Sequence, residues 1–292
     1  MHVLVVPSAY PTEGHSLDGV FFREQARALH KRGLVVGVIY PDHRSLAGTG
    51  RMDLFRNLFR VRVADDGGVP TFRSTYPAAP KLPRVRGKIW LSQLDLLFAR
   101  YVAEHGRPDL IHAHGILWAG VGAARMGGSE GIPVVLTAHS SSFARRLVRD
   151  WEAEHISTAL RSVESVVAVS RSLRGELVRY APEVQIDVIP NLVDTDFFTP
   201  GPPRDTTGFT WLAVALLTEN KGIATLLEAF EGAFGDQPDV QLRIAGDGPE
   251  LPKLRVLAER SDVADRVIFA GRLTREAVSY THLRAHETTS LI

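Results

Sequence analysis

The sequence predicts an α/β protein with a complete N-terminal doubly wound, Rossmann-like domain and an incomplete second domain of the same kind. Short β-branched runs alternate with segments of helical periodicity, which is typical of parallel sheets covered by helices. The same alternation starts again after a stretch rich in proline and glycine at 199–203. At 292 residues, the chain is long enough for two such domains.

The N-terminal domain is predicted over residues 1–198. Apolar positions within 22–29 share one helical face, as do those within 94–98, so helices at both places can cover a sheet. The runs that we interpret as buried strands are 3–6, 35–40, 110–113, 134–138, 166–169 and 186–189.

A linker is predicted over 199–209, followed by the first part of a C-terminal domain over 210–277. The C-terminal domain is expected to contain three strands, fewer than the mean of about five or six in a sheet. The last residues, 278–292, add no strand–helix unit and resemble a translated sequencing-adapter read-through, so we predict a non-native tail on a truncated domain. The expected strands are 211–217, 240–245 and 267–270, with helices at about 222–234 and 249–259.

Composition excludes several classes of protein. Cysteine is absent, which excludes disulfides, cysteine-ligated zinc and a thiol nucleophile. No run approaches about 18 consecutive apolar residues, and the N-terminus lacks the basic segment and cleavage site of a signal peptide, so we expect a cytoplasmic protein. The formal charge is +1 and no nucleic-acid module is present, so nucleic acid is not an expected partner.

Basic residues are concentrated within 51–100, where 10 Lys or Arg stand against 4 Asp or Glu. Apolar side chains, among them Phe55, Phe59 and Trp90, are interleaved with them. This mixture suits peripheral contact with an anionic membrane, here its inner face, or with an anionic acceptor. A solvated helix face beside its own core gives the same pattern, and the sequence leaves these interpretations open.

The loop between the first strand and the first helix carries Gly19 directly before the helix. In open α/β folds, ligands bind to loops at the carboxyl ends of the strands. A glycine there lets backbone amides approach an anion without a Cβ in the way, and the helix dipole assists. Gly19 is therefore a candidate anion-binding residue, although a simple turn glycine gives the same signal.

His114 and His139 stand at the ends of two predicted strands, so both are expected to point into one crevice. Histidine can position a hydroxyl or relay a proton near neutral pH. His112, two residues before His114, is expected to face the opposite side of the sheet. A purely structural role stays open for His114 and His139, and zinc is not expected because no acidic or cysteine partner stands at ligand spacing.

Two strand-to-helix turns of the second domain are suited to anions. Lys221, within Asn-Lys-Gly at 220–222, can face a phosphate group together with nearby amides. A lysine at a helix N-terminus is disfavoured by the helix dipole, so its presence here favours a functional role. Gly246 and Gly248 lie in a Gly-Asp-Gly-Pro turn after the next strand, with Pro249 suited to the first helical position.

In order and spacing, these motifs are similar to those of retaining glycosyltransferases of family 4, which have the two-domain GT-B fold. The resemblance spans 3–277 and rests most on Pro-Asn-Leu-Val-Asp at 190–194 and on the turns at 220–222 and 246–249. It implies contact with the donor diphosphate for Gly19, Lys221, Gly246 and Gly248, catalytic contact with the transferred sugar for His139, acceptor or sugar contact for His114 and Ser140, and a hinge role for Asn191.

The sequence also departs from the family pattern. Leu192 stands where glycine is usual, and Leu216 stands where the arginine of a Gly-Arg-Leu motif is usual, which removes half of the expected cationic clamp. The E-x7-E motif, whose carboxylates hold the donor sugar and ribose, has no counterpart in the 292 residues. The resemblance therefore implies metal-free sugar transfer from a nucleotide diphosphate sugar to a glycan or lipid-linked acceptor by a complete form, and we expect this fragment to lack activity.

Other functions remain open. A non-catalytic carbohydrate- or nucleotide-binding protein is consistent with Leu216 and the missing carboxylates. A nucleotide-sugar 2-epimerase of the same fold is disfavoured by the motifs at 190–194 and 220–222. An NAD-dependent dehydrogenase is disfavoured because the first strand–helix loop has no G-x-G-x-x-G.

Overall fold

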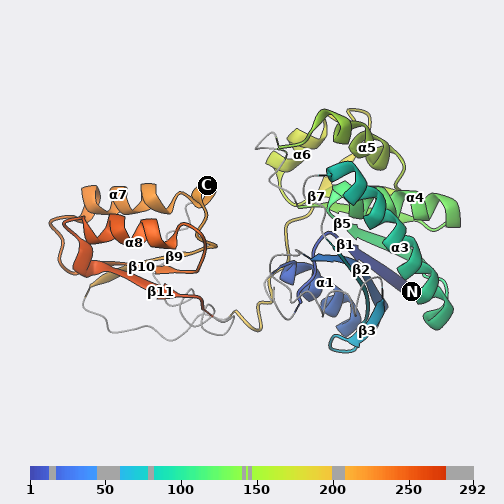
Figure 1. The fold of residues 1–292 in the computed structure, drawn as a ribbon, viewed down its shortest axis with the longest axis horizontal. Helices are drawn as coiled ribbons and strands as arrows, with labels where there is room; N and C mark the ends of the chain where they lie inside the picture. Colours follow the sequence, from blue (N-terminus) through green and yellow to red (C-terminus); the bar gives the residue numbers. More distant parts are fainter. Residues whose placement is uncertain are drawn as a thin grey trace. The chain divides into compact units, whose positions relative to one another are not determined.

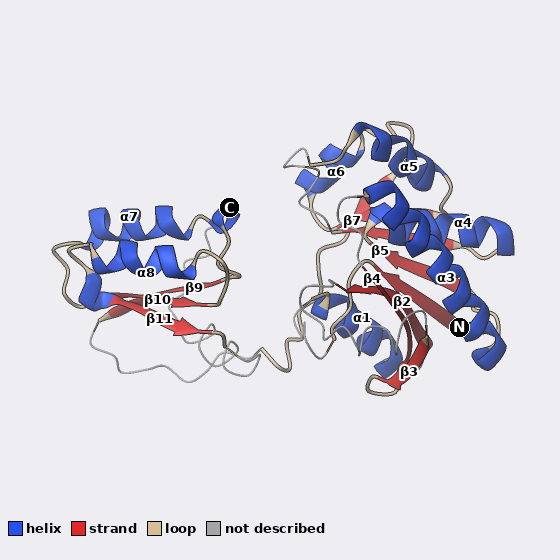
Figure 2. Cartoon of the chain, viewed as in Figure 1, coloured by secondary structure: helices blue, strands red, loops and turns tan. Residues whose placement is uncertain are grey.

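The computed structural model describes residues 1–12, 18–44, 60–77, 82–139, 143, 147–198 and 208–273. The chain divides into two compact units, Met1–Leu192 and Val193–Ile292, whose helices and strands are coloured in Figure 2. Most of the predicted linker (199–207) and all of the predicted tail (278–292) lie outside the described residues.

The described residues of the first unit form an eight-stranded sheet in the order β3-β4-β2-β1-β5-β6-β7-β8, and among these strands only β3 pairs with its neighbour in the antiparallel sense. All six strands predicted for this domain are present in it, so the predicted parallel, doubly wound class is confirmed. The strands are β1 (His2–Pro7), β2 (Val35–Arg44), β3 (Val61–Asp65), β4 (Pro70–Pro77), β5 (Leu110–His114), β6 (Val134–Ala138), β7 (Ser165–Ala168) and β8 (Ile186–Val188).

The sequence pattern did not predict β3 or β4. Strand β3 lies at the edge of the sheet, and its residues after Val61 are exposed, so it shows no apolar alternation. Strand β4 is buried but places Thr71, Ser74 and Thr75 inside, which breaks the apolar run expected of a central strand.

Helices cover both faces of this sheet because its strands alternate their side chains. Val3 and Val5 of β1 join the core with α1, whereas Leu4 and Val6 join the core with the other helices. Figure 1 shows α1 on one face and α3 and α4 on the other. The helical segments are α1 (Val20–Lys31), α3 (Pro83–His105), the π-type turn η1 (Ile116–Gly120), α4 (Val121–Glu130), α5 (Asp150–Arg161) and α6 (Arg171–Leu177).

Strand β1 lies between β2 and β5, so the strand order reverses at this point. Loops that leave neighbouring strands in opposite directions open a crevice at their carboxyl ends. The loops after β1, β5 and β6 therefore form the expected ligand-binding edge of the first unit.

The second unit contains, among its described residues, a parallel sheet in the order β11-β10-β9. Leu227 and Phe230 of one helix and Leu254 of the next pack on Leu242 and Ile244 of the central strand, so this unit has its own core. Its segments are β9 (Phe209–Val214), η2 (Glu219–Lys221), α7 (Ile223–Phe234), β10 (Val240–Ala245), α8 (Leu251–Glu259), η3 (Ala264–Arg266) and β11 (Val267–Gly271).

None of the helices in the described ranges combines the length and the apolar character that crossing a membrane requires.

Candidate functional site

Gly19 begins α1 at the carboxyl end of β1. Its φ of 65° lies in the left-handed region, and a Cβ built on it would stand 2.3 Å from the carbonyl oxygen of Ala9. Both facts require glycine at this turn. The carbonyl of Gly19 accepts a hydrogen bond from the amide of Phe22 at 3.0 Å, so the residue closes the first turn of the helix. Residues 13–17 of the same loop lie outside the described residues.

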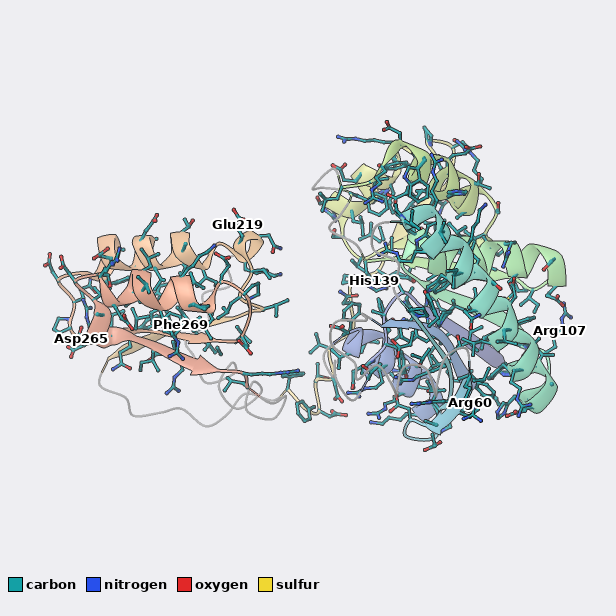
Figure 3. All side chains as sticks on the ribbon, in the orientation of Figure 1. Arg60, Arg107, His139, Glu219, Asp265 and Phe269 are labelled. Atoms are coloured by element: carbon teal, nitrogen blue, oxygen red, sulfur yellow. The ribbon has the colours of Figure 1, made fainter. Side chains whose placement is uncertain are left out.

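The structure brings His114 and His139 together at the carboxyl ends of β5 and β6. The Nδ1 atom of His114 lies 3.1 Å from Nε2 of His139. Phe22 of α1 packs on both rings, with centroid distances of 5.0 Å to His114 and 4.8 Å to His139. Figure 3 shows His139 beside α1, at the edge of the sheet where the strands end. The sequence offered no signal for Phe22 beyond its place on the buried face of α1.

The expectation that His112 faces the opposite side of the sheet is wrong. Residues two apart in a strand point to the same face. The register pairs His112 with Val5, and Val5 belongs to the core under α1. The His112 and His114 rings lie 4.1 Å apart, and His112 Nε2 lies 2.9 Å from the hydroxyl of Thr137. We call His112, His114 and His139 the histidine cluster.

Burial keeps the histidine cluster uncharged at neutral pH. Desolvation lowers the pKa of His112 to about 4, with a smaller contribution from His139. Desolvation lowers the pKa of His139 to about 4 as well, and the side chain of Asn191 opposes part of this shift. For the fully buried His114, desolvation and its two neighbours place the pKa well below 6.5. Each neutral ring offers one donor and one acceptor nitrogen.

Two further predicted site residues lie next to this cluster in the sequence or in space. Asn191 comes just before the boundary between the two units and interacts with His139. Ser140, which follows His139, lies outside the described residues.

In the second unit, the loops after β9 and β10 bind each other through their backbones. The amide of Leu217 donates to the carbonyl of Asp247 at 2.8 Å, and the amide of Glu250 donates to the carbonyl of Leu217 at 3.1 Å. A Cβ on Gly246 would stand 1.8 Å from the Ala215 carbonyl oxygen, and one on Gly248 would stand 2.4 Å from that of Leu217. Both glycines therefore allow the loops to approach closely.

Lys221 ends the short turn η2 directly before Gly222 and α7, and its side chain is exposed. The amide of Gly248 donates to the carboxylate of its neighbour Asp247 at 2.8 Å, so this turn binds a carboxylate oxygen of the chain itself. Leu216 is 64% exposed, so it is not needed for the core of this unit. These loops thus present a cation and an exposed apolar side chain, whereas the amide of Gly248 is occupied by Asp247.

Across the parts of the chain that the structure describes, no group of three His, Asp or Glu side chains is placed to hold a metal ion.

Comparison with known proteins identifies the family of this chain. The chain matches Glycosyltransferase Family 4 over residues 19–197 and Glycosyl transferases group 1 over residues 194–288. Among curated proteins, it is 29% identical over 276 residues to the putative teichuronic acid biosynthesis glycosyltransferase TuaC of Bacillus subtilis, covering 85% of this chain and 66% of the relative. It is 25% identical over 219 residues to the phosphatidylinositol N-acetylglucosaminyltransferase GPI3 subunit of Saccharomyces cerevisiae, covering 72% of this chain and 44% of the relative.

Among solved structures, Anabaena Alr3699/HepE in complex with UDP superposes with a TM-score of 0.65 at 17% identity, over 97% of this chain and 72% of that one. This likeness supports the two Rossmann-like units. The chain spans less than two thirds of the length of the curated relatives just described. Because the first family match covers more than half of the chain, this protein belongs to Glycosyltransferase Family 4, with the GT-B fold.

Proposed function

We propose that the protein is part of a retaining glycosyltransferase that moves a sugar from a nucleotide diphosphate sugar to a glycan or lipid-linked acceptor. The observation that carries this proposal is the neutral histidine cluster at the ligand-binding edge of a family 4 fold. Two of its relatives are glycosyltransferases by name, and one of these is a phosphatidylinositol N-acetylglucosaminyltransferase subunit.

The donor diphosphate is assigned to the loops of the second unit and to Gly19. A leaving nucleoside diphosphate develops negative charge, and the ammonium of Lys221 with the amides before α7 would stabilise that charge. The glycine turn at 246–248 lies just before α8, and a diphosphate oxygen would have to displace the Asp247 carboxylate to reach the amide of Gly248. The HepE structure contains UDP, and we extend this ligand to the present chain as the first donor nucleotide to test.

His139 is the proposed contact to the transferred sugar. Its Nε2 atom is engaged by His114, and its Nδ1 atom is buried on the side of Asn191, so a sugar hydroxyl would have to take the place of Asn191 to reach it. A neutral imidazole can hold a sugar hydroxyl without placing a competing positive charge beside the diphosphate. His114 and Ser140 are kept as candidate contacts to the acceptor or sugar, and Asn191 as a hinge residue.

If Lys221 neutralises the charge of the leaving diphosphate, no metal ion is needed for that purpose, and we propose a metal-free reaction. Peripheral contact with the inner face of an anionic membrane through 51–100 also stays a proposal, since 51–59 and 78–81 lie outside the described residues. A cytoplasmic location and the lack of activity of these 292 residues alone remain predictions.

The test of the proposed function is the stereochemistry of donor turnover. The complete protein that contains these residues, rather than the 292 residues alone, would be incubated with UDP-glucose or UDP-N-acetylglucosamine, and the anomer released first would be followed by proton NMR. Retention predicts that the α-linked donor yields the α-sugar first. Replacing His139 by Ala is expected to slow release of UDP by about a hundredfold or more, since lost proton transfer or positioning has effects of that size. The same change at the exposed His105, at the end of α3 and outside both proposed sites, should leave the rate unchanged.

A second candidate function follows from Leu216. An exposed leucine in the place of the family's arginine leaves Lys221 as the cation of this turn, which weakens the stabilisation of a leaving group. A non-catalytic nucleotide- or carbohydrate-binding protein would tolerate this. Binding of UDP-glucose without release of UDP in any variant would favour this alternative, and release of the β-sugar first would contradict retention.

A further inference from the structure

A small pocket lies on the face of the sheet away from the histidine cluster, beside the first turns of α3. It has a volume of about 110 Å³ and is lined by Ser8, Tyr76, Arg86, Trp90, Leu117 and Trp118. Ser8 follows β1 directly, and its amide donates to the carbonyl of His114 at 2.8 Å. The pocket therefore adjoins the same edge of the sheet as the histidine cluster, from the other side.

The placement of Trp118 in this pocket is conformationally costly. Its φ of 64° and ψ of −53° are unusual for a residue with a side chain, and such positions concentrate at functional sites. Its ring also needs Gly87 inside α3, since a Cβ there would stand 2.2 Å from the indole. Glycine in a helix interior is unfavourable. Because Trp118 is only half-buried, the packing of the core does not account for these two features.

Arg86 gives the pocket a positive charge. It is half-buried, and no acidic side chain of the described residues forms an ion pair with it. Burial, and to a smaller extent Tyr40, raise the pKa of the Tyr76 hydroxyl in the wall of the pocket. Arg86 opposes this shift, and its effect is larger than that of Asp42, so the charge of Arg86 is felt at the wall. A half-buried guanidinium without a carboxylate is suited to bind an anion from outside the chain.

The shape and the remaining lining restrict what that anion can belong to. Pockets for whole small ligands measure about 300–1,000 Å³, so one of this size takes a single group of a larger molecule. Two hydroxyls, of Ser8 and Tyr76, line it together with Arg86, and a phosphate offers one oxygen more than a carboxylate to such a set.

Aromatic surface continues outside the pocket. The rings of Trp118 and Trp151 lie 6.0 Å apart, and the guanidinium of Arg84 lies 5.4 Å from the Trp151 ring. Such rings offer broad apolar faces beside a polar handle. A molecule anchored by an oxyanion in the pocket can therefore lie along Trp118 towards Trp151.

We propose that this pocket binds a phosphate group of the acceptor, with Arg86 as its ion partner and Trp118 beneath the attached sugar or polyol ring. The proposal rests on the proposed glycosyltransferase function and adds the class of acceptor. The phosphate belongs either to a soluble sugar phosphate, a monoester with three terminal oxygens, or to the diester headgroup of a lipid, which has two, and both present an anionic oxygen to Arg86.

The test compares Arg86→Gln with Lys88→Gln, an equal loss of charge at an exposed position of the same helix. Glucose 6-phosphate and glucose would be titrated into the full chain by calorimetry. Binding to vesicles containing phosphatidylinositol would be compared with vesicles containing the same fraction of phosphatidylserine. Removing the guanidinium should weaken binding of the phosphate-bearing probe by about tenfold to a hundredfold, which corresponds to the loss of a charge-assisted hydrogen bond.

A soluble source predicts that glucose 6-phosphate binds more tightly than glucose and that only Arg86→Gln weakens it. A lipid source predicts preference for phosphatidylinositol over phosphatidylserine, again lost only in Arg86→Gln. Equal weakening by both variants, no preference in either pair of probes, or no binding of either probe would overturn the proposal. UDP-glucose binding, measured on the same samples, reports separately on the proposed function and on folding of the variants.

Discussion

At the scale of single residues, the histidine cluster combines close contact with the absence of charge. Three histidines within hydrogen-bonding or stacking distance cannot carry two charges at once, because two buried imidazolium ions would repel, and burial disfavours even a single charge. Their lowered pKa values follow from this burial. The proposed role of His139 and the stability of the first unit therefore depend on the same protonation.

We predict that stability falls as the pH is lowered through the histidine cluster. The folded-state pKa values of His112 and His139, each about 4, lie below the 6.5 of the unfolded chain. Between these values the unfolded state binds more protons, so the free energy of unfolding is full above pH 6.5 and decreases towards pH 4. Each buried histidine contributes up to about 1.4 kcal/mol per pH unit. Urea unfolding at intervals between pH 7.5 and about 5, above most carboxylate titrations, measures this slope.

The control for this prediction is the side chain itself. A His112→Gln, His139→Gln double variant should show a flatter dependence over the same range, whatever its absolute stability. Changing the exposed His155 to Gln should leave the slope as it was. A slope that is the same in all three proteins would show that other groups are responsible.

At the scale of elements, the turn between β1 and α1 depends on Gly19. The left-handed backbone and the close contact with Ala9 both exclude a side chain at Gly19. Gly33 is also left-handed, with φ of 85°, but nothing lies within 4 Å of its Cβ position. Comparing alanine at the two positions therefore separates the backbone conformation from the steric clash.

We predict that Gly19→Ala lowers the free energy of unfolding by about 2 kcal/mol or more beyond the effect of Gly33→Ala, because backbone at 2.3 Å cannot move aside without shifting α1. Urea denaturation of both variants measures the difference. Equal losses would mean that the loop relaxes freely, and Gly19 would then be a simple turn glycine.

The elements also show how far sequence reasoning reached. Apolar strands such as 3–6 and 134–138 were predictable because burial on both faces leaves a continuous apolar run. The exposed edge strand β3 leaves no such run. The predicted strand ends placed His114 and His139 correctly. His112 was assigned to the wrong face, although residues two apart in a strand share a face. The residue types around Trp118 give no sign of its left-handed backbone.

At the scale of the whole molecule, each unit has its own core and its own cluster of candidate residues. The first unit holds the histidine cluster and the pocket of Arg86, and the second holds Lys221 and the glycine turn. Family membership joins these into one proposed reaction: donor on the second unit, acceptor on the first. The donor site is the claim on which the remainder depends.

The most direct test is calorimetric titration of UDP-glucose into the chain, with GDP-mannose as a second nucleotide, for the original protein and for Lys221→Gln and Lys253→Gln. Lys253 is exposed in α8 and pairs with Glu250, so its loss is an equal change of charge in the same unit. We predict binding of at least one donor, weakened about tenfold or more by Lys221→Gln and little by Lys253→Gln. No binding of either donor, or equal weakening by the two variants, would contradict it.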